Sequence, residues 1–490
     1  MQIPILRKDI QFFPDPSRVI TRFFSNGELH TKSLLQRVMM LDEPQVRLIL
    51  EQTLREFAGR HRNLFEVFHR HCEQINPIIE RYGIPYDQLT DQRKMLLGAY
   101  STMEYAVEAA ALFNPSIVED PDQTFLEAGE KRVILSFRAT GEGHISSVVF
   151  RRAILDKENN LRIVKVGKHI EMAEIIHKNL YDKKRFITKM SEMHIPEKYT
   201  AGFMETLPEK FEYMMLLNSM DRMLEKEFVS AEQRKAIVEI TWLIDSYYDV
   251  QFQGDSDLSE RVIFPLSASE KNGIEDARFV RLYDEDDHSV KVYATYTAFN
   301  GQTILPKLLA TKDFYTFRMM PLLGNGAQNK NLALFPRKIN GNYAMLARVD
   351  GINNYIMYSS RITVWNNPIL LQEPEFPWEL NHMGNCGSPL WTPEGWLLIT
   401  HGVGPMRRYC IGVSLLSLSD PTQVIGRLKE PLLVPLERER EGYVPNVVYS
   451  CGALIHNDSL ILPYAISDYA SSYAVISLPV LMEVLRNNHL

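Results

Sequence analysis

Two adjacent carboxylates in the stretch "NGIEDARF" are the first candidates for chemistry. Glu275 and Asp276 lie between Gly273, which permits close approach of the backbone, and Arg278. In an extended chain neighbouring side chains point to opposite sides, so one carboxylate can face a ligand while the other binds a structural partner such as Arg278. A solvent-exposed acidic turn is the alternative interpretation.

Polar side chains also recur at similar points of five strand-like segments. The segments are "VILSFRATGEG", "VYATYTAFNG", "YAMLARVDG", "WLLITHGVG" and "LILPYAISDYA", which start at Val133, Val292, Tyr343, Trp396 and Leu460. Counting five residues from the first four starts leads to Arg138, Thr297, Arg348 and His401, and Asp468 comes a few places later in the fifth. Two arginines, a histidine and an aspartate at such points indicate a shared site.

The spacing of these segments predicts the fold. Their starts are 159, 51, 53 and 64 residues apart, and three of these steps approach the length of a four-stranded propeller blade, about 40 to 50 residues. The first step is longer by roughly the length of a helical stretch. We therefore predict an all-β five-bladed propeller over residues 126–490, interrupted by a helical insertion at about 156–259 and preceded by a helical N-terminal region, 1–125. A β-sandwich, the alternative, does not explain a period near 50.

In a propeller, the ends of the innermost strands converge on one funnel. We expect the five segments to be those strands, with "NGIEDARF" in the connection before the second of them. The polar residues would then meet at the funnel. The alternative is a structural ring of ion pairs around the channel.

Helical patterns support the two predicted helical regions. Apolar residues recur at steps of three and four in "EPQVRLILEQTLREFAGRHRNLFEVFHRHCEQI". Its histidines, His61, His69 and His71, include no pair spaced by four, so a polar helix face is predicted there and no metal site. Ser230 and Gln233 predict a capping box that opens a helix.

Composition narrows the class of protein. Apolar residues make up 45% and charged residues 23% of the 490 positions, as in soluble globular proteins. No apolar run is long enough to span a bilayer, and the first residues do not resemble a signal peptide. Four scattered cysteines predict neither zinc nor disulfides and suit a reducing cytoplasm. A net charge of −7 with mixed signs argues against nucleic-acid binding.

The sequence resembles glycoside hydrolase family 130, the β-mannoside phosphorylases and related mannosidases, which are five-bladed propellers. The matching pieces are "GIEDARF", "KNLALFPRKINGNYAML", "GWLLITHGVG", "RYCIGVSLLSLSDPTQVIGR" and "GYVPNVVYSCGALI", in family order. The resemblance implies that Asp276 is the general acid, acting through a sugar hydroxyl. It implies phosphate binding by Arg138, Lys330, Asn331, Arg348 and His401. It also implies that Asp468 binds the mannosyl unit, and we place Glu275 and Arg278 beside it as substrate-binding residues.

The chain departs from the family pattern at three positions. Ala277 replaces a usual Pro, Lys330 replaces a common Arg, and His382 stands where a phosphate-binding Lys is typical. Arg407 and Arg408, just after the fourth segment, are candidates to restore the positive charge that His382 lacks.

The charges favour phosphate over water as the nucleophile. Phosphate needs cations and N–H donors, whereas water needs a second carboxylate as a base, for which Glu142 is the candidate to watch. We therefore expect phosphorolysis of a β-mannoside to α-mannose 1-phosphate, with inorganic phosphate as co-substrate, no cofactor or metal, no membrane partner and possible homo-oligomers. The alternatives are a water-using mannosidase and a non-catalytic glycan-binding propeller. Three aromatic residues are candidates to stack on sugars or simply to pack in the core: Tyr296, Trp378 and Tyr443.

Overall fold

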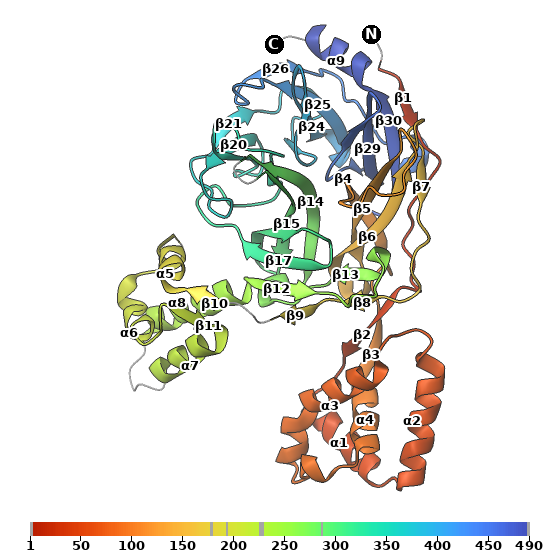
Figure 1. Cartoon of the computed structure of the whole chain (residues 1–490), viewed down its shortest axis with the longest axis vertical. Helices are drawn as coiled ribbons and strands as arrows, with labels where there is room; N and C mark the ends of the chain where they lie inside the picture. Colours follow the sequence, from red (N-terminus) through yellow and green to blue (C-terminus); the bar gives the residue numbers. More distant parts are fainter. Residues whose placement is uncertain (1–2, 177–179, 193–194, 225–229, 286–287, 488–490) are drawn as a thin grey trace.

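The computed structural model describes residues 3–176, 180–192, 195–224, 230–285 and 288–487. Antiparallel sheets fill the upper part of the molecule in Figure 1, and two groups of helices extend from them. One group comes from the N-terminal part of the chain and the other from the middle.

The five segments predicted as strands are strands. They are β5 (Lys131–Thr140), β15 (Ser289–Phe299), β19 (Tyr343–Ala347), β24 (Gly395–Val403) and β29 (Ser459–Ile466). Each lies second in its group, after a strand that the period did not reveal. These first strands are β4 (Ala111–Glu119), β14 (Gly273–Asp284), β18 (Ala333–Leu334), β22 (His382–Asn385) and β27 (Val448–Tyr449). The five segments were expected to be the innermost strands, but each is the second strand of its group. The first strands were missed because they are short or irregular and carry no clear alternation.

Two further strands complete each group. They are β6 (Ser146–Leu155) and β7 (Leu161–Ile163), β16 (Ile304–Thr311) and β17 (Thr316–Pro321), β20 (Asn354–Ser359) and β21 (Ile369–Gln372), β25 (Tyr409–Leu416) and β26 (Val424–Arg427), and β30 (Ala470–Ser477) and β1 (Ile5–Arg7). Short strands β23 (Leu390–Thr392) and β28 (Leu454–His456) pair with β24 and β29. Strand β1 pairs with β30 in the register Ile5↔Ile476, so the beginning of the chain completes the last group.

The groups contact one another in chain order and the last contacts the first. Strand β4 contacts β14, β15 contacts β18, β19 contacts β22, β25 contacts β27, and β29 returns to β4. The first two groups share one sheet, in which β14 pairs with β6 at the single position Gly273↔Ser146. The circuit of contacts brings the first strands of all groups together.

The N-terminal part mixes helices and strands. Its helices are α1 (Glu28–Met39), α2 (Glu43–Phe57), α3 (Leu64–Arg81) and α4 (Asp91–Tyr100), and β2 (Val19–Phe23) pairs with β3 (Thr102–Ala106) at their base. The prediction that residues 1–125 are helical is therefore wrong for the strands in that range, including β4. Strand β4 is buried along nearly all of its length, so it lacks the alternation of polar and apolar residues that marks a half-buried strand.

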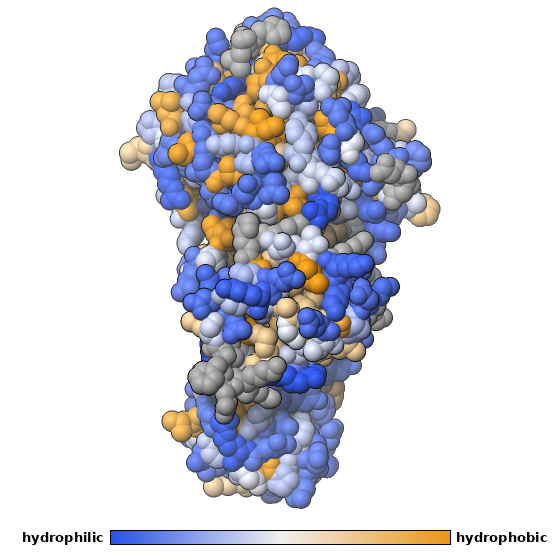
Figure 2. Space-filling view, turned by 90° about the vertical axis from the view of Figure 1, so that its left-hand side faces the viewer, coloured by the Kyte–Doolittle hydropathy of each residue, from blue (hydrophilic) through white to orange (hydrophobic). Residues whose placement is uncertain are grey.

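The middle of the chain holds the second group of helices. They are α5 (Lys183–Glu192), α6 (Ala201–Met204), α7 (Tyr213–Leu224) and α8 (Ala231–Asp245). The predicted capping box is confirmed, because the Gln233 N–H donates to Ser230 Oγ and the Ser230 N–H donates to Gln233 Oε1. Figure 2 views this side of the molecule, where hydrophobic residues are interspersed with hydrophilic ones.

The predicted insertion, about 156–259, is helical only in part. Strands within or beside it are β8 (Glu171–Met172), β9 (Glu174–Ile176), β10 (Leu180–Asp182), β11 (Lys210–Glu212), β12 (Tyr248–Gln251) and β13 (Arg261–Ile263). Strand β12 pairs with β17 and β9, so the insertion is built into the second group of strands. Among the described residues, no helix has the length and apolar character needed to cross a membrane.

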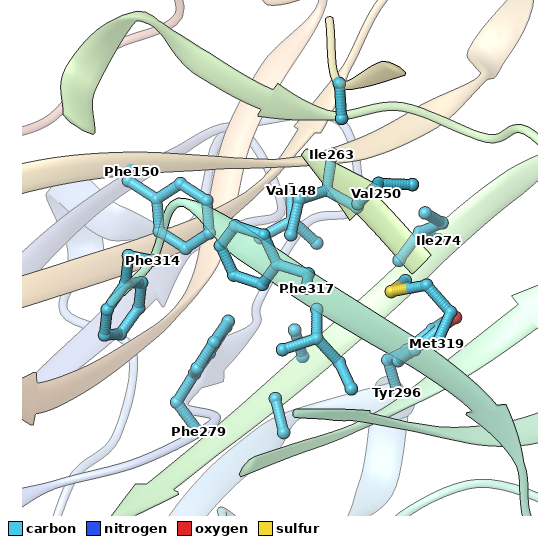
Figure 3. Close-up of a cluster of buried hydrophobic side chains, with 14 of the residues drawn as sticks. Val148, Phe150, Val250, Ile263, Ile274, Phe279, Tyr296, Phe314, Phe317 and Met319 are labelled. Atoms are coloured by element: carbon cyan, nitrogen blue, oxygen red, sulfur yellow. The ribbon is translucent and has the colours of Figure 1, made fainter. Parts of the chain in front are cut away.

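An aromatic core between the first two groups of strands fixes β14 (Figure 3). Phe150 of β6 packs edge-on against Phe279 of β14, and Phe314 and Phe317 close the cluster. Burial of each such side chain contributes about 1.5–3 kcal/mol. Because Ile274 and Phe279 both enter this core, the segment between them is held in place at both ends.

Candidate active site

The polar residues singled out in the sequence converge on one cavity of about 180 Å³. Its lining comprises Asn114, Arg138, Asp276, Lys330, Asn331, Arg348, His401, Arg407, Tyr409, Val444, Val447, Tyr449 and Asp468. The residues come from all five groups of strands and from the loops at their ends. The cavity therefore brings together the predicted acid, the five predicted phosphate ligands and Asp468.

A bulge in β14 aims Asp276 at this cavity. From Gly273 onward "GIEDARF" is a buried strand and not an exposed turn or a connection, and its register with β15 shifts between Glu275 and Arg278. Asp276 has φ of +54°, a left-handed conformation that is uncommon outside glycine. The extra residue resets the alternation, so Ile274 and Ala277 both face the core. Glu275 and Asp276 are thereby left to the polar side.

Asp276 is an ionised carboxylate surrounded by donors. Its Oδ1 accepts a hydrogen bond from Asn114 Nδ2 at 2.7 Å and lies 3.4 Å from Arg138 Nη1. Burial alone would raise the pKa of Asp276, but the charges of nearby cations hold that pKa below the usual aspartate value. Those cations are Arg138, Arg278 and Lys330.

Glu275 holds two of the cations in place. Its Oε1 accepts from Arg138 Nη2 and its Oε2 accepts from Lys330 Nζ, each at 2.7 Å. Arg138 is further fixed by donating from Nε to Ser146 Oγ at 2.9 Å. Glu275 is absent from the cavity lining, so the structure gives it contacts with cations and none with the cavity itself.

Arg348 has few hydrogen-bond partners among the described residues. Its Nη1 lies 3.4 Å from His401 Nε2, and its buried Nε has no hydrogen-bond partner among the described residues. His401 is buried, and burial together with the charge of Arg348 holds its pKa far below the usual histidine value. With its Nδ1 3.3 Å from the Asn385 carbonyl, neutral His401 donates there and accepts from Arg348. A half-buried guanidinium with an unused donor is suited to an anion.

Arg278 lies behind the cavity wall and not in its lining. Its Nη1 donates to the Asp276 carbonyl at 2.8 Å and its Nη2 donates to Tyr449 Oη at 2.7 Å. Tyr449 Oη also accepts from Asn331 Nδ2 at 2.9 Å. Since two donors occupy this oxygen, its own O–H is left to donate into the cavity.

Three lining residues with polar side chains were missed in the sequence: Asn114, Tyr409 and Tyr449. Asn114 has φ of +49° and lies at a bulge of β4, between Phe113 and Ser116. The Asn-Pro pair at 114–115 is a signal of irregular backbone that could have marked the position. Tyr449 and Tyr409 lie in apolar runs whose sequence gives no sign of a cavity.

Asp468 follows β29 and faces Asp276 across the cavity. Burial and the negative charge of Asp276 raise the pKa of Asp468 to about 7, against the opposing charges of Arg138 and Arg407. The two acids therefore differ in protonation at neutral pH, since the pKa of Asp276 is lowered. Such a separation of two carboxyl groups is typical of sites that transfer protons.

The raised pKa of Asp468 predicts that the stability of the folded chain depends on pH. Its pKa is about 7 in the folded chain and near 3.8 when exposed, so folding favours the protonated form and stability falls as pH rises between these values. Asp468→Asn removes this loss. We expect the melting temperature of Asp468→Asn, relative to the unaltered chain, to be higher at pH 8 than at pH 5.5. A constant difference across this window would contradict the assignment, and thermal unfolding monitored by circular dichroism measures it.

Other predicted residues lie outside the cavity lining. His382 contacts the Tyr409 and His401 rings, and burial lowers its pKa to about 4, so it is neutral. Glu142, the candidate base, is exposed in a turn and does not line the cavity that contains Asp276. The three aromatic candidates are also elsewhere: Tyr296 donates to buried Glu270, Trp378 donates to the Lys429 carbonyl, and exposed Tyr443 contacts His144.

Within the described ranges, no group of three or more histidine, cysteine or acidic residues is arranged to hold a metal ion. His61 and His71 are buried, so the predicted polar helix face is wrong for these two residues. His61 contacts Glu104 and His71 contacts Thr102.

Comparison with known proteins gives one family match. The profile described as Glyco_hydro_130, beta-1,4-mannooligosaccharide phosphorylase, matches residues 231–487, just over half of the chain. A beta-1,2-mannobiose phosphorylase of Thermoanaerobacter sp. (strain X514) is 36% identical over 219 residues, which are 42% of this chain and 67% of that protein.

Two further relatives show the extent of the similarity. A 1,2-beta-oligomannan phosphorylase of the same organism is 40% identical over 153 residues, 31% of this chain and 51% of the relative. A beta-1,2-mannobiose phosphorylase of Listeria innocua is 31% identical over 215 residues, 42% of this chain and 58% of the relative. The chain thus spans between half and three-fifths of the length of these two relatives. The structure of a Listeria innocua beta-1,2-mannobiose phosphorylase has a TM-score of 0.46 at 23% identity and covers 78% of this chain and 94% of its own.

Proposed function

Because the chain belongs to glycoside hydrolase family 130, we propose that it cleaves a β-mannoside with inorganic phosphate and inverts the anomeric carbon. The products are α-mannose 1-phosphate and a shortened acceptor. The observation that carries this proposal is Arg348, a guanidinium at the cavity whose Nε has no partner among the described residues. Curated relatives named as mannoside phosphorylases support the same reaction.

In the proposed mechanism Asp276 is the general acid. Phosphate attacks the anomeric carbon from the face opposite the leaving group, the glycosidic C–O bond breaks, and the proton of Asp276 reaches the leaving oxygen, directly or through a sugar hydroxyl. The cations around Asp276 lower its pKa and hold it ionised in the structure. A bound phosphate offsets those cations, raises the proton affinity of Asp276 and so prepares the acid.

The remaining residues bind and orient the reactants. We assign phosphate binding to Arg138, Lys330, Asn331, Arg348 and His401, and binding of mannosyl hydroxyls to Asp468. His401 acts by orienting Arg348, since its Nε2 accepts from that guanidinium. Glu275 and Arg278, predicted as substrate-binding residues, are assigned a supporting role: Glu275 orients Arg138 and Lys330, and Arg278 orients Tyr449 and the Asp276 backbone.

For the fold we propose a five-bladed β-propeller, with each group of strands as one blade. The closed circuit of contacts and the pairing of β1 with β30 support this arrangement. The proposed catalytic domain is 126–490 together with β1 and β4, interrupted by the insertion, and the helices within 28–100 form a separate N-terminal unit. Four unpaired cysteines support a cytoplasmic location.

A hydrolase that uses water is the second candidate. Asp468, whose pKa is raised to about 7, is a base of suitable strength and shares the cavity with Asp276. Dependence on phosphate separates the two functions: the phosphorylase requires it and releases mannose 1-phosphate, whereas the hydrolase releases free mannose at a rate that phosphate does not change. Neither activity is expected of a glycan-binding propeller.

Arg348→Gln tests the phosphate assignment. We expect it to raise the KM for inorganic phosphate about 10-fold to 100-fold, because a charge-assisted contact in a partly dry site contributes about 1.5–3 kcal/mol. The KM for the mannoside should change little. Initial rates with varied phosphate measure both constants. Arg318→Gln is the matched control, since Arg318 pairs with Asp249 on the surface. An unchanged phosphate KM in Arg348→Gln would contradict the assignment.

A further inference from the structure

The short loop between β24 and β25 carries a cation, Arg407, that has no role in the mechanism proposed above. Arg407 lies in the turn Pro405–Arg407 and lines the cavity, while the adjacent Met406 is 90% exposed at the tip of the loop. Met406 and Arg407 have φ of +57° and +55°, so two consecutive residues other than glycine adopt the left-handed conformation. Such backbone persists where the surroundings enforce it, often at ligand-binding sites.

The base of the loop is fixed against the protein. The Gly404 N–H donates to the Arg408 carbonyl at 3.0 Å, and the Arg408 N–H donates to the Pro405 carbonyl at 3.2 Å. A side chain at Gly404 would lie 3.2 Å from the Trp378 backbone, so the loop packs closely on that segment. The loop therefore presents Arg407 at the lip of the cavity from an anchored base.

The cations at the site differ in how fully they are engaged. Arg138 and Lys330 share Glu275, and Arg278 is bonded to Tyr449 and the Asp276 carbonyl. Arg348 contacts only the neutral His401 among the described residues. Arg407 has no hydrogen bond or ion pair with any described residue, although its charge acts on Asp468 and His382.

The charge balance of the site points to a dianion. Five cations line the cavity or contact its lining: Arg138, Arg278, Lys330, Arg348 and Arg407. Glu275 and Asp276 oppose them with two negative charges, and Asp468, whose pKa is about 7, is only partly ionised near neutral pH. The excess is therefore between two and three positive charges, enough to balance the charge of about −1.5 to −2 on a phosphoryl group. Without Arg407 the excess falls to between one and two.

We propose that Arg407 is a phosphoryl-binding residue that closes the site from its lip, opposite Arg348. This inference rests on the proposed phosphorylase function. The ligand chemistry is a phosphoryl dianion, supplied by inorganic phosphate in cleavage and by mannose 1-phosphate in synthesis. The position at the lip gives Arg407 contact with the anion as it enters and leaves, whereas Arg348 holds it from within.

Arg407→Gln tests the proposal, with Arg408→Gln as the matched control from the same loop. The control removes the same charge from a side chain that does not line the cavity. We expect Arg407→Gln to raise the KM for inorganic phosphate, and that for mannose 1-phosphate in synthesis, about tenfold each. The KM for the neutral mannoside should stay within about twofold, and Arg407→Lys should recover part of the loss because it keeps the charge.

Two results would overturn the proposal: equal phosphate KM values in Arg407→Gln and Arg408→Gln, or a rise confined to the mannoside KM. Calorimetric titration with inorganic phosphate adds a measurement that needs no turnover, and it should show about tenfold weaker binding to Arg407→Gln than to Arg408→Gln. If the unaltered chain cleaves mannosides at a rate independent of phosphate, the proposed function fails. The titration then still decides whether Arg407 binds the anion.

Discussion

Asp276→Asn is expected to lower kcat for an unactivated β-mannoside by about 10²-fold to 10⁴-fold, the usual contribution of a general acid. The amide has nearly the same shape and keeps the contact with Asn114, but it has no acidic proton for the leaving oxygen. The bulge that holds position 276 is enforced by Ile274 and Phe279 in the core, so the fold should persist. Steady-state phosphorolysis assays with saturating phosphate measure the loss.

Substrates with different leaving groups show whether Asp276 acts as a general acid or only supports the structure. An aryl β-mannoside whose phenol leaves without protonation should lose far less rate in Asp276→Asn than an oligosaccharide does. Asp284→Asn, at the far end of the same strand, is the control and should retain its rate on both substrates. Equal losses on the two substrates, or a wild-type rate in Asp276→Asn, would sink the assignment.

Lys307→Met is expected to destabilise the chain by about 3–5 kcal/mol, since it leaves a buried carboxylate without its cation. Lys307 Nζ donates to Glu270 Oε1 at 2.6 Å, and both side chains are fully buried. Tyr248 and Tyr296 also donate to this carboxylate, and Tyr248 belongs to the strand that ends the insertion. Denaturant unfolding followed by fluorescence measures the change.

A second substitution shows whether the lost stability comes from the broken ion pair with Glu270 or from changed packing. Glu270→Gln combined with Lys307→Met removes both charges, so the double variant should recover much of the stability. In Lys307→Met alone, burial raises the pKa of Glu270, so the destabilisation should shrink as pH falls from 8 to 5.5. Exposed Lys312→Met is the control and should change stability by less than about 0.5 kcal/mol. A double variant no more stable than the single one would contradict this account.

The sequence predicted the strands that form long apolar runs between turn residues and missed the short or interrupted ones. Strands β15 and β24 are such runs, although β24 is buried along its whole length. Strand β18 has two residues, and β4 is buried almost throughout and interrupted by a bulge, so neither carries a period. Partial burial of the insertion's short strands against the sheet is likewise a tertiary effect that local sequence does not encode.

Four of the predicted site residues converge because each lies near the end of a repeated strand or follows it, a rule that the sequence does contain: Arg138, Arg348, His401 and Asp468. Asp276 instead lies near the start of β14, and Lys330 and Asn331 precede β18. The direction in which each side chain points could not be predicted from the sequence. Glu275 and Asp276 were predicted to point apart in an extended chain, whereas a bulge sends both to the polar side. The partner of Asp276, Asn114, lies 162 positions earlier in the chain and becomes a neighbour only through the contact of β4 with β14.

The pairing of β1 with β30 affects the order in which the chain folds. Ile5 and Ile476 are register partners although 471 positions separate them. Translation releases β1 long before its partner exists, so the earliest strand must wait, unpaired, until synthesis reaches the last sheet. Contacts of such high sequence separation slow folding. We therefore expect the pairing of β1 with β30 to form late in folding. The cavity, which draws on all five groups of strands, is expected to acquire its full set of side chains only then.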